Sequence, residues 1–374
     1  MSAGGPRGPA LAVPATVLVI VTRRIGDVLL ATPLIRSIKA AWPQAQVDAL
    51  LFAGTEGVLA ANPDLRRVLA VAERPQLAAH AAFVARLWRR YDVALSCLTG
   101  DRPTLYAWIA GRWRAGFVAG GSGARWKPWL LSRAVEFDDA DTHTVAMNLA
   151  LAEALGIPPR PEVVARWSAA DEARVKALLD GGGCLPAYAA LHPHPKFSYK
   201  MWHAEGWIGL ADWLAPRGFT TVLTGGGDSA ETHFVTELAA RMPRGTISLA
   251  GKLSLAQTAC LIAGARVFVG PDTATTHVAA ALGVPTVALY GPSNPVKWGP
   301  WPRDYSGRGS PWRRAGSQAS GNVELVQGAG ACVPCMDEGC DRHVASGSEC
   351  LRQLSLATVI AAAERALAAA PAGS

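Results

Sequence analysis

Long apolar runs are missing from this sequence of 374 residues. No run reaches the roughly 18 apolar residues that a membrane-spanning helix needs. Residues 10–21 resemble the core of a signal peptide, but Arg23 and Arg24 follow at once and no small-x-small cleavage site appears. We therefore expect a cytoplasmic protein whose contact with a membrane, where there is one, is peripheral.

Charged residues are also scarce, at 17% of the chain, while 50% of the residues are apolar. This apolar content is enough to give two domains of ordinary size a core each. Lys and Arg outnumber Asp and Glu by 36 to 29, a net charge of +7. Such a balance favours an anionic partner but is too mild to indicate nucleic acid.

The dinucleotide fingerprint G-x-G-x-x-G is absent from the first strand-to-helix turn. Residues 17–22 read as a buried strand and residues 27–42 as a helix that ends before Pro43. A single glycine, Gly26, stands between them and lets the backbone approach a ligand closely. The turn is therefore predicted to bind something other than NAD.

Strand and helix patterns alternate along the chain in two successive sets, which predicts two doubly wound α/β domains with parallel sheets. The Gly- and Pro-rich start predicts a disordered extension. The segments that we expect are an extension at 1–14, an N-terminal domain at 15–168, a linker with a glycine hinge at 169–186, a C-terminal domain at 187–353 and a last helix at 354–370.

Residues 267–292 read as strand, tight turn, helix and strand, with Gly283 ending the helix. The first amides of that helix lack partners and carry partial positive charge, so its start can bind phosphate. Small polar residues stand at this point: Asp272, Thr273, Thr275 and Thr276. An ordinary capped helix explains them equally well, but it does not explain His277 in the first turn.

Two segments, 24–35 and 270–285, with Lys200-Met201-Trp202 between them, resemble the signature segments of glycosyltransferase family 9, the ADP-heptose:lipopolysaccharide heptosyltransferases. The resemblance covers most of residues 16–365. It implies the GT-B fold, in which two Rossmann-like domains face each other across a cleft and the last helix crosses back to the N-terminal domain. It also implies inverting transfer with no metal at the reaction centre.

Carried over position by position, the resemblance implies that Lys200 faces the donor phosphates. The pyrophosphate and sugar pocket would be built by Asp272, Thr273, Ala274, Thr275 and His277, where Ala274 replaces the usual glycine of the family. The loop 225–228 resembles the nucleoside-side loop of the family, with Asp228 or Glu231 available to a ribose hydroxyl. A simple surface turn remains the alternative for this loop.

The resemblance also implies that Asp27 is the catalytic base, although an aspartate at this turn is a good helix cap too. We place Gly26 and His143 on the acceptor side with it. Residues 86–133 carry nine basic residues and five tryptophans against two aspartates, which favours an anionic, amphipathic acceptor. Arg112 and Arg114 are the predicted contacts, and a solvated helix face over core tryptophans is the alternative.

Four of the seven cysteines, Cys332, Cys335, Cys340 and Cys350, fall within nineteen residues. The cytoplasm disfavours disulfides, so we expect either one structural zinc or iron or four reduced thiols. Four thiolate ligands would leave no open position for chemistry. By resemblance, some heptosyltransferases that modify proteins carry such a cysteine finger.

The sequence thus predicts an enzyme that transfers heptose from ADP-heptose to a hydroxyl of an anionic glycolipid, the lipopolysaccharide inner core, at the cytoplasmic face of the inner membrane. Three alternatives stay open. They are a heptosyltransferase acting on protein or another glycan, a GT-B sugar-nucleotide epimerase, and a zinc-ribbon interaction module that would leave residues 16–290 unexplained.

Overall fold

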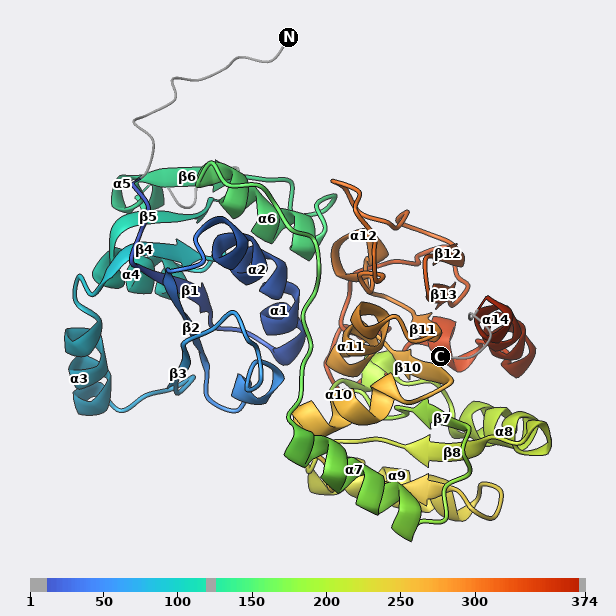
Figure 1. Cartoon of the computed structure of the whole chain (residues 1–374). Helices are drawn as coiled ribbons and strands as arrows, with labels where there is room; N and C mark the ends of the chain where they lie inside the picture. The colour runs from blue at the N-terminus through green and yellow to red at the C-terminus, as the bar shows by residue number, and fades with distance from the viewer. Residues whose placement is uncertain (1–11, 119–125, 370–374) are drawn as a thin grey trace. The chain divides into compact units, whose positions relative to one another are not determined.

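The computed structural model of the protein describes residues 12–118 and 126–369 (Figure 1). The chain divides into two compact units, the first containing the residues up to Glu56 and Asn62–Val164. The second contains Gly57–Ala61 and the chain from Ala165 onward. Most of the predicted extension, residues 1–11, lies outside the described residues.

The first unit is built on a six-stranded parallel sheet in the order β3-β2-β1-β4-β5-β6. Its central strands are continuous apolar runs because helices cover both faces of the sheet (Figure 1). The strands are β1 (Thr16–Val21), β2 (Gln46–Phe52), β3 (Arg67–Val71), β4 (Tyr91–Ser96), β5 (Gly111–Val118) and β6 (Arg133–Glu136).

The helices of the first unit form two groups, and within each group the helices contact one another. One group contains α1 (Ile25–Leu30), α2 (Thr32–Ala41) and α6 (Thr144–Ala154). The other group contains α3 (Leu77–Leu87), α4 (Asp101–Ala110) and α5 (Lys127–Leu130).

The helix predicted at 27–42 is divided into α1 and α2. Pro33 is the cause, because it has no amide hydrogen and its ring excludes the carbonyl four residues earlier. That carbonyl, of Leu29, instead accepts a hydrogen bond of 2.7 Å from the Thr32 hydroxyl. The break leaves α1 as a short helix directly after β1.

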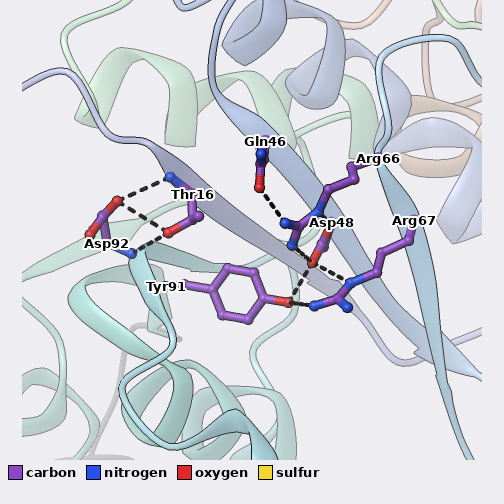
Figure 2. Close-up of polar contacts among 7 residues, drawn as sticks. All are labelled: Thr16, Gln46, Asp48, Arg66, Arg67, Tyr91 and Asp92. Carbon is purple, nitrogen blue, oxygen red and sulfur yellow. Dashed lines mark hydrogen bonds and ion pairs between the residues drawn. The ribbon is translucent and has the colours of Figure 1, made fainter.

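A buried carboxylate closes the amino edge of the first sheet (Figure 2). Asp48 of β2 accepts hydrogen bonds from Arg66 Nε, Arg67 Nε and the Tyr91 hydroxyl at 2.8, 2.8 and 2.6 Å. Burial alone would raise the pKa of Asp48, but these donors outweigh burial and lower it. The cluster ties β2 to β3 and β4.

The second unit contains a seven-stranded sheet in the order β12-β13-β11-β10-β7-β8-β9, in which only β12 runs antiparallel to its neighbour. The strands are β7 (Tyr188–Leu191), β8 (Thr220–Leu223), β9 (Ile247–Ser248), β10 (Val267–Pro271), β11 (Thr286–Tyr290), β12 (Gln318–Ser320) and β13 (Val323–Gln327).

Helices cover both faces of this sheet as well (Figure 1). Three of them are neighbours on one side: α7 (Ala169–Gly181), α10 (Leu255–Ala263) and α11 (Ala274–Leu282). The main core lies on the other side and includes side chains of α8 (Ala204–Leu214), α9 (Ser229–Ala240) and α14 (Leu356–Ala368). Two further helices are short: α12 (Pro295–Trp298), which follows β11, and α13 (Glu349–Arg352), which precedes α14.

Two of the predicted segment boundaries are wrong. The linker expected at 169–186 is largely the helix α7, which packs against α10, so the second unit begins near Ala165. The last helix does not join the first unit. Four residues of α14 pack in the core of the second unit with β10, β11 and β13, because its apolar positions recur on one helical face: Val359, Ala362, Ala363 and Ala366.

Both sheets share the strand order of the Rossmann fold, 3-2-1-4-5-6 in the sequence order of each unit, with β12 added at one edge of the second. The order reverses between β1 and β4 in the first unit and between β7 and β10 in the second. In such sheets ligands bind outside the carboxyl ends of the strands at this point of reversal. The loops after these four strands are therefore the places to look for function.

Candidate functional site

The loops that follow β7 and β10 meet through an ion pair between Lys200 and Asp272. Lys200 ends the short 3-10 turn Ser198–Lys200, and Asp272 directly follows β10. Asp272 also accepts hydrogen bonds from Ser293 Oγ at 2.6 Å and from the Tyr290 hydroxyl at 3.3 Å. Three loops at the carboxyl edge of one sheet thus converge on one carboxylate.

Electrostatics at this point follow from burial and from the ion pair. Burial alone would raise the pKa of Asp272, but Lys200, His277 and the Ser293 hydroxyl lower it. Burial lowers the pKa of His277 to about 4, although Asp272 opposes this shift. His277 is therefore neutral at pH 7, and its buried Nδ1 has no hydrogen-bond partner among the described residues.

The start of α11 lies beside the Lys200–Asp272 pair. Thr273 occupies the cap position but makes no capping hydrogen bond, and its hydroxyl instead lies 2.8 Å from that of Thr275. Ala274 is the first helical residue, and its backbone is not left-handed, so alanine replaces the expected glycine without strain. The predicted helix end is confirmed, with Gly283 in the left-handed conformation at φ 79°.

The loop after β8 uses its carboxylates internally. Asp228 Oδ1 caps α9 by accepting from the amides of Ala230 and Glu231 at 3.0 and 3.4 Å. Glu231 Oε1 accepts from the Gly226 amide at 2.6 Å. Capping of α9 accounts for Asp228, which was predicted to bind the donor ribose. Glu231 uses one carboxylate oxygen for the Gly226 amide, and its other oxygen remains for a further partner.

Two histidines after β7 were not predicted. His192 Nδ1 lies 3.0 Å from the Thr224 hydroxyl, and burial together with His194 lowers its pKa to about 4. His194 packs on Phe234, and its electrostatic interaction with Glu231 connects the β7 and β8 loops. Only the strand end before His192 marked this position in the sequence, and no spacing motif accompanies it.

In the first unit, Asp27 follows the carboxyl end of β1 in the first turn of α1. Its side chain is 8% exposed, and Oδ2 lies 3.6 Å from Arg23 Nε. The cap position belongs to Arg24, so Asp27 lies within the first turn of α1 and not at its cap.

Gly26 and His143 also lie in this unit. Gly26 is part of the first turn of α1. His143 is fully buried and caps α6, because its Nδ1 accepts from the Val145 amide at 3.1 Å. Since α6 packs against α1, His143 has a structural role near the Asp27 helix.

Arg112 lies near the amino edge of the sheet, and Arg114 lies two residues further along β5. Arg112 Nη1 bonds Asp92 Oδ1 at 3.0 Å, and Asp92 also bonds the start of β1 (Figure 2). Arg114 Nε is buried without a hydrogen-bond partner among the described residues. Asp27 lies beyond the other end of β1, a strand length of roughly 15 Å or more. The structure therefore does not bring the two arginines together with the predicted base.

The four clustered cysteines lie in one segment of the second unit. Cys350 is buried, Cys335 is half-buried and Cys332 and Cys340 are exposed, all as free thiols. Burial, with a contribution from the other three thiols, raises the pKa of Cys350 to about 11. Among the described residues no three His, Cys, Asp or Glu side chains are arranged to hold a metal ion.

The profile of glycosyltransferase family 9 (heptosyltransferase) matches residues 81–320, more than half of the chain. The chain belongs to glycosyltransferase family 9. It is therefore a glycosyltransferase, and the family predicted from the sequence is confirmed. Within the described residues, no helix has the length and apolar character to cross a bilayer.

Relatives within family 9 match along most of their length. Lipopolysaccharide heptosyltransferase 3 of Escherichia coli is 26% identical over 289 residues, which cover 74% of this chain and 83% of that protein. Lipopolysaccharide heptosyltransferase 1 of Pseudomonas aeruginosa is 29% identical over 335 residues, which cover 87% of each.

Solved structures of other glycosyltransferases share the fold. Escherichia coli heptosyltransferase WaaC with ADP aligns with a TM-score of 0.71 at 21% identity, covering 94% of this chain and 99% of that one. WaaC with ADP-2-deoxy-2-fluoro heptose gives 0.68 at 20% identity, covering 94% and 99%. TibC, an iron-containing dodecameric glycosyltransferase from enterotoxigenic Escherichia coli, gives 0.50 at 15% identity, covering 94% and 76%. The fold class predicted from the sequence, GT-B with two Rossmann-like domains, is confirmed.

Proposed function

We propose that this enzyme transfers heptose from ADP-heptose, with inversion, to a hydroxyl of an anionic glycolipid, the inner core of lipopolysaccharide. The observation that carries the proposal is the Lys200–Asp272 pair beside the start of α11, at the point where the strand order reverses. The names of the relatives support heptose and lipopolysaccharide, and the WaaC structures support an ADP-sugar donor.

The donor diphosphate is assigned to the start of α11. The first amides of this helix point out of its N-terminus, and Thr273 does not cap them. The hydroxyls of Thr273 and Thr275 stand beside them as further donors. Because Asp272 already neutralises Lys200, the amides and hydroxyls supply most of the attraction for the free nucleotide.

Lys200 is assigned a second role during the reaction. As the bond between the anomeric carbon and the β-phosphate oxygen breaks, that oxygen takes the electron pair and becomes more negative. The ammonium of Lys200 and the α11 amides then stabilise the leaving ADP more strongly than they stabilise the bound donor.

Asp27 is assigned as the base. The acceptor hydroxyl attacks the anomeric carbon on the face opposite ADP, and its proton passes to the Asp27 carboxylate as the new glycosidic bond forms. The low exposure of Asp27 and its position after β1, where the first sheet reverses its strand order, support this role. Arg23 lies beside it, with Nε 3.6 Å from Asp27 Oδ2.

We further propose that the enzyme works in the cytoplasm with its first unit at the membrane surface. Helix α4 contacts both α3 and α5, and exposed tryptophans stand at the ends of the outer two: Trp88 after α3, and Trp126 and Trp129 at α5. Exposed basic side chains accompany them at Arg86, Arg90 and Arg133. Tryptophan and arginine together suit an interface of anionic headgroups.

Incubation with ADP-heptose, with and without a lipopolysaccharide acceptor, tests the reaction. We expect ADP only when acceptor is present, and an anomeric configuration in the product opposite to that of the donor. ADP released equally without acceptor, or a donor isomer in place of product, would exclude glycosyl transfer to this acceptor.

Protein as the acceptor is a second candidate, and the cysteine segment is the observation that favours it. TibC, which shares the fold, is iron-containing, and the four thiols of this chain are the candidate ligands for one structural zinc or iron. Labelling of a protein band, and of no glycolipid, by ADP-heptose carrying a radioactive sugar would favour this candidate over the first.

A further inference from the structure

Most of the cysteine segment of the second unit, from residue 336 to residue 350, contacts the loops after β7 and β11, which supply Lys200 and Ser293 to Asp272. The Met336 amide donates to the Pro292 carbonyl at 2.8 Å, and the Ser348 hydroxyl donates to the Tyr199 carbonyl at 2.7 Å. Neither Met336 nor Ser348 belongs to the proposed donor site. Their acceptors, Pro292 and Tyr199, directly precede Ser293 and Lys200, which both contact Asp272.

The Ser348 contact bears on Lys200. Ser348 is 3% exposed, so its hydroxyl has no competing water and its bond to Tyr199 is strong for a neutral pair. Tyr199 lies in the short turn that Lys200 ends, where the Lys200 amide donates to Phe197 at 3.0 Å. The carbonyl held by Ser348 is thus the last peptide group before the lysine that pairs with Asp272.

The Met336 contact bears on Ser293 in the same manner. Pro292 directly precedes Ser293, whose hydroxyl donates to Asp272 Oδ2 at 2.6 Å. Lys200 and Ser293 share this carboxylate oxygen. Residues 336–350 therefore hold the peptide groups immediately before Lys200 and Ser293, the two side chains that bond to Asp272.

The segment is firm enough to act as a support. The Cys340 amide donates to Gly347 at 3.0 Å, and the Ser346 hydroxyl donates to Glu338 at 3.1 Å. Cys350 docks on two glycines where side chains do not fit. A Cβ at Gly291 would lie 3.1 Å from the Cys350 sulfur, and one at Gly328 would lie 2.1 Å from its carbonyl oxygen.

We propose that residues 336–350 are a positioning element for the donor-phosphate site, in which Ser348 acts through Tyr199 on Lys200 and Met336 acts through Pro292 on Ser293. This inference rests on the proposed assignment of ADP to the Lys200–Asp272 site. It gives the cysteine segment a task in donor binding that needs no contact with the donor.

Titration calorimetry with ADP on the full chain tests the proposal with Ser348→Ala. We expect ADP to bind about fivefold more weakly, the effect of one lost neutral hydrogen bond. Hydrogen exchange at the Lys200 amide should quicken as well, because the turn loses its support. The matched control is Ser355→Ala, which removes a cap hydrogen bond of 3.2 Å from α14 in the same unit and should leave ADP affinity unchanged.

A double-mutant cycle with Lys200→Ala separates this inference from the proposed function. When Ser348 acts through Lys200, Ser348→Ala causes no further loss of ADP affinity once Lys200 is absent. Additive losses, unchanged affinity in Ser348→Ala, or an equal loss in Ser355→Ala overturn the positioning role while the site stands. Unchanged ADP affinity in Lys200→Ala overturns the proposed contact of Lys200 with the phosphates, and with it the premise of this inference.

Discussion

Asp272 Oδ2 accepts from Lys200 Nζ across 72 residues of sequence, and this pair joins the loops after two neighbouring strands, β7 and β10. The pair has no net charge, so a diphosphate that binds here meets the helix start of α11 with Lys200 already engaged. The carboxylate therefore keeps the ammonium in place while the site is empty. It also limits how strongly the free enzyme attracts anions.

Asp272→Asn tests that arrangement. The change leaves Lys200, which is 17% exposed, without its counter-charge, and we expect a loss of about 2–4 kcal/mol in the free energy of unfolding. ADP should then raise the melting temperature of the variant more than that of the parent, because its phosphates replace the lost negative charge. Asp228→Asn, which keeps the cap of α9, is the control. A smaller ADP effect in Asp272→Asn contradicts the assignment of the phosphates to Lys200.

Asp27→Asn tests the catalytic base. We expect turnover to fall by roughly 10²–10⁴-fold with ADP affinity and melting temperature near those of the parent, because asparagine fits the site but cannot take a proton. Asp171→Asn, at a carboxylate that belongs to the capping box of α7, should keep full turnover. Turnover within a few-fold of normal in Asp27→Asn shows that the base is another group.

Stability should fall as pH decreases from 6.5 towards 4. Burial lowers the pKa of His192 and of His277 to about 4, so both stay neutral in the folded protein over this range. Their ordinary pKa is near 6.5, so the unfolded chain binds protons that the folded chain does not, and unfolding is favoured. Each histidine contributes at most about 3 kcal/mol, with the full stability present above pH 6.5.

Thermal unfolding at pH 7.5 and 4.5 measures this effect. His277→Gln should lose less stability between the two pH values than the parent does, while His233→Gln, at an exposed position of α9, should behave as the parent. Identical pH dependence in His277→Gln and the parent contradicts the burial of a neutral imidazole at this position.

Trp129→Ser tests the membrane-facing surface. Trp129 is 88% exposed, and we expect its loss to weaken binding to vesicles of anionic phospholipid by about tenfold in a sedimentation assay. Added salt should weaken binding by the parent too, since the accompanying arginines are exposed. Leu185→Ser, at a half-exposed leucine of the second unit, is the control. Equal binding by all three proteins excludes this face as the contact.

From the four clustered cysteines we expect elemental analysis of the purified protein to find about one zinc or iron per chain. Cys335→Ser should then remove the metal and lower the melting temperature more than turnover per molecule, whereas Cys260→Ser, outside the segment, should keep the metal. Because Cys332 and Cys340 are exposed, both must approach Cys350 for a metal to bind. Protein that is free of metal and fully stable would show that the thiols are simply reduced.

Local signals in the sequence predicted the secondary structure around Asp272 well. The stretch 267–292 has a β-branched run, a helix bounded by Thr273 and Gly283, and a second run, so each boundary is set by neighbouring residues. Pro33 likewise sets the division between α1 and α2 from within the local sequence. These features depend on backbone chemistry within a few residues.

Other features depend on which distant segments meet, and the sequence alone does not determine that. Arg112 belongs to a basic, tryptophan-rich segment, yet its neighbour is Asp92 on the adjacent strand. Nothing near Ser348 indicates that its hydroxyl reaches Tyr199, 149 residues away. His192 contacts Thr224, directly after β8, and His194 interacts with Glu231 of α9, so no motif marked these histidines.

The position of α14 has a consequence for synthesis of the chain. This helix is the last element that the structure describes, and its residues 359–366 complete the core over β10, β11 and β13. That face of the sheet therefore stays open until these residues have been synthesised and have left the ribosome. We expect the nascent second unit to need a chaperone during this interval, and a stop codon shortly before Leu356 to yield aggregated protein.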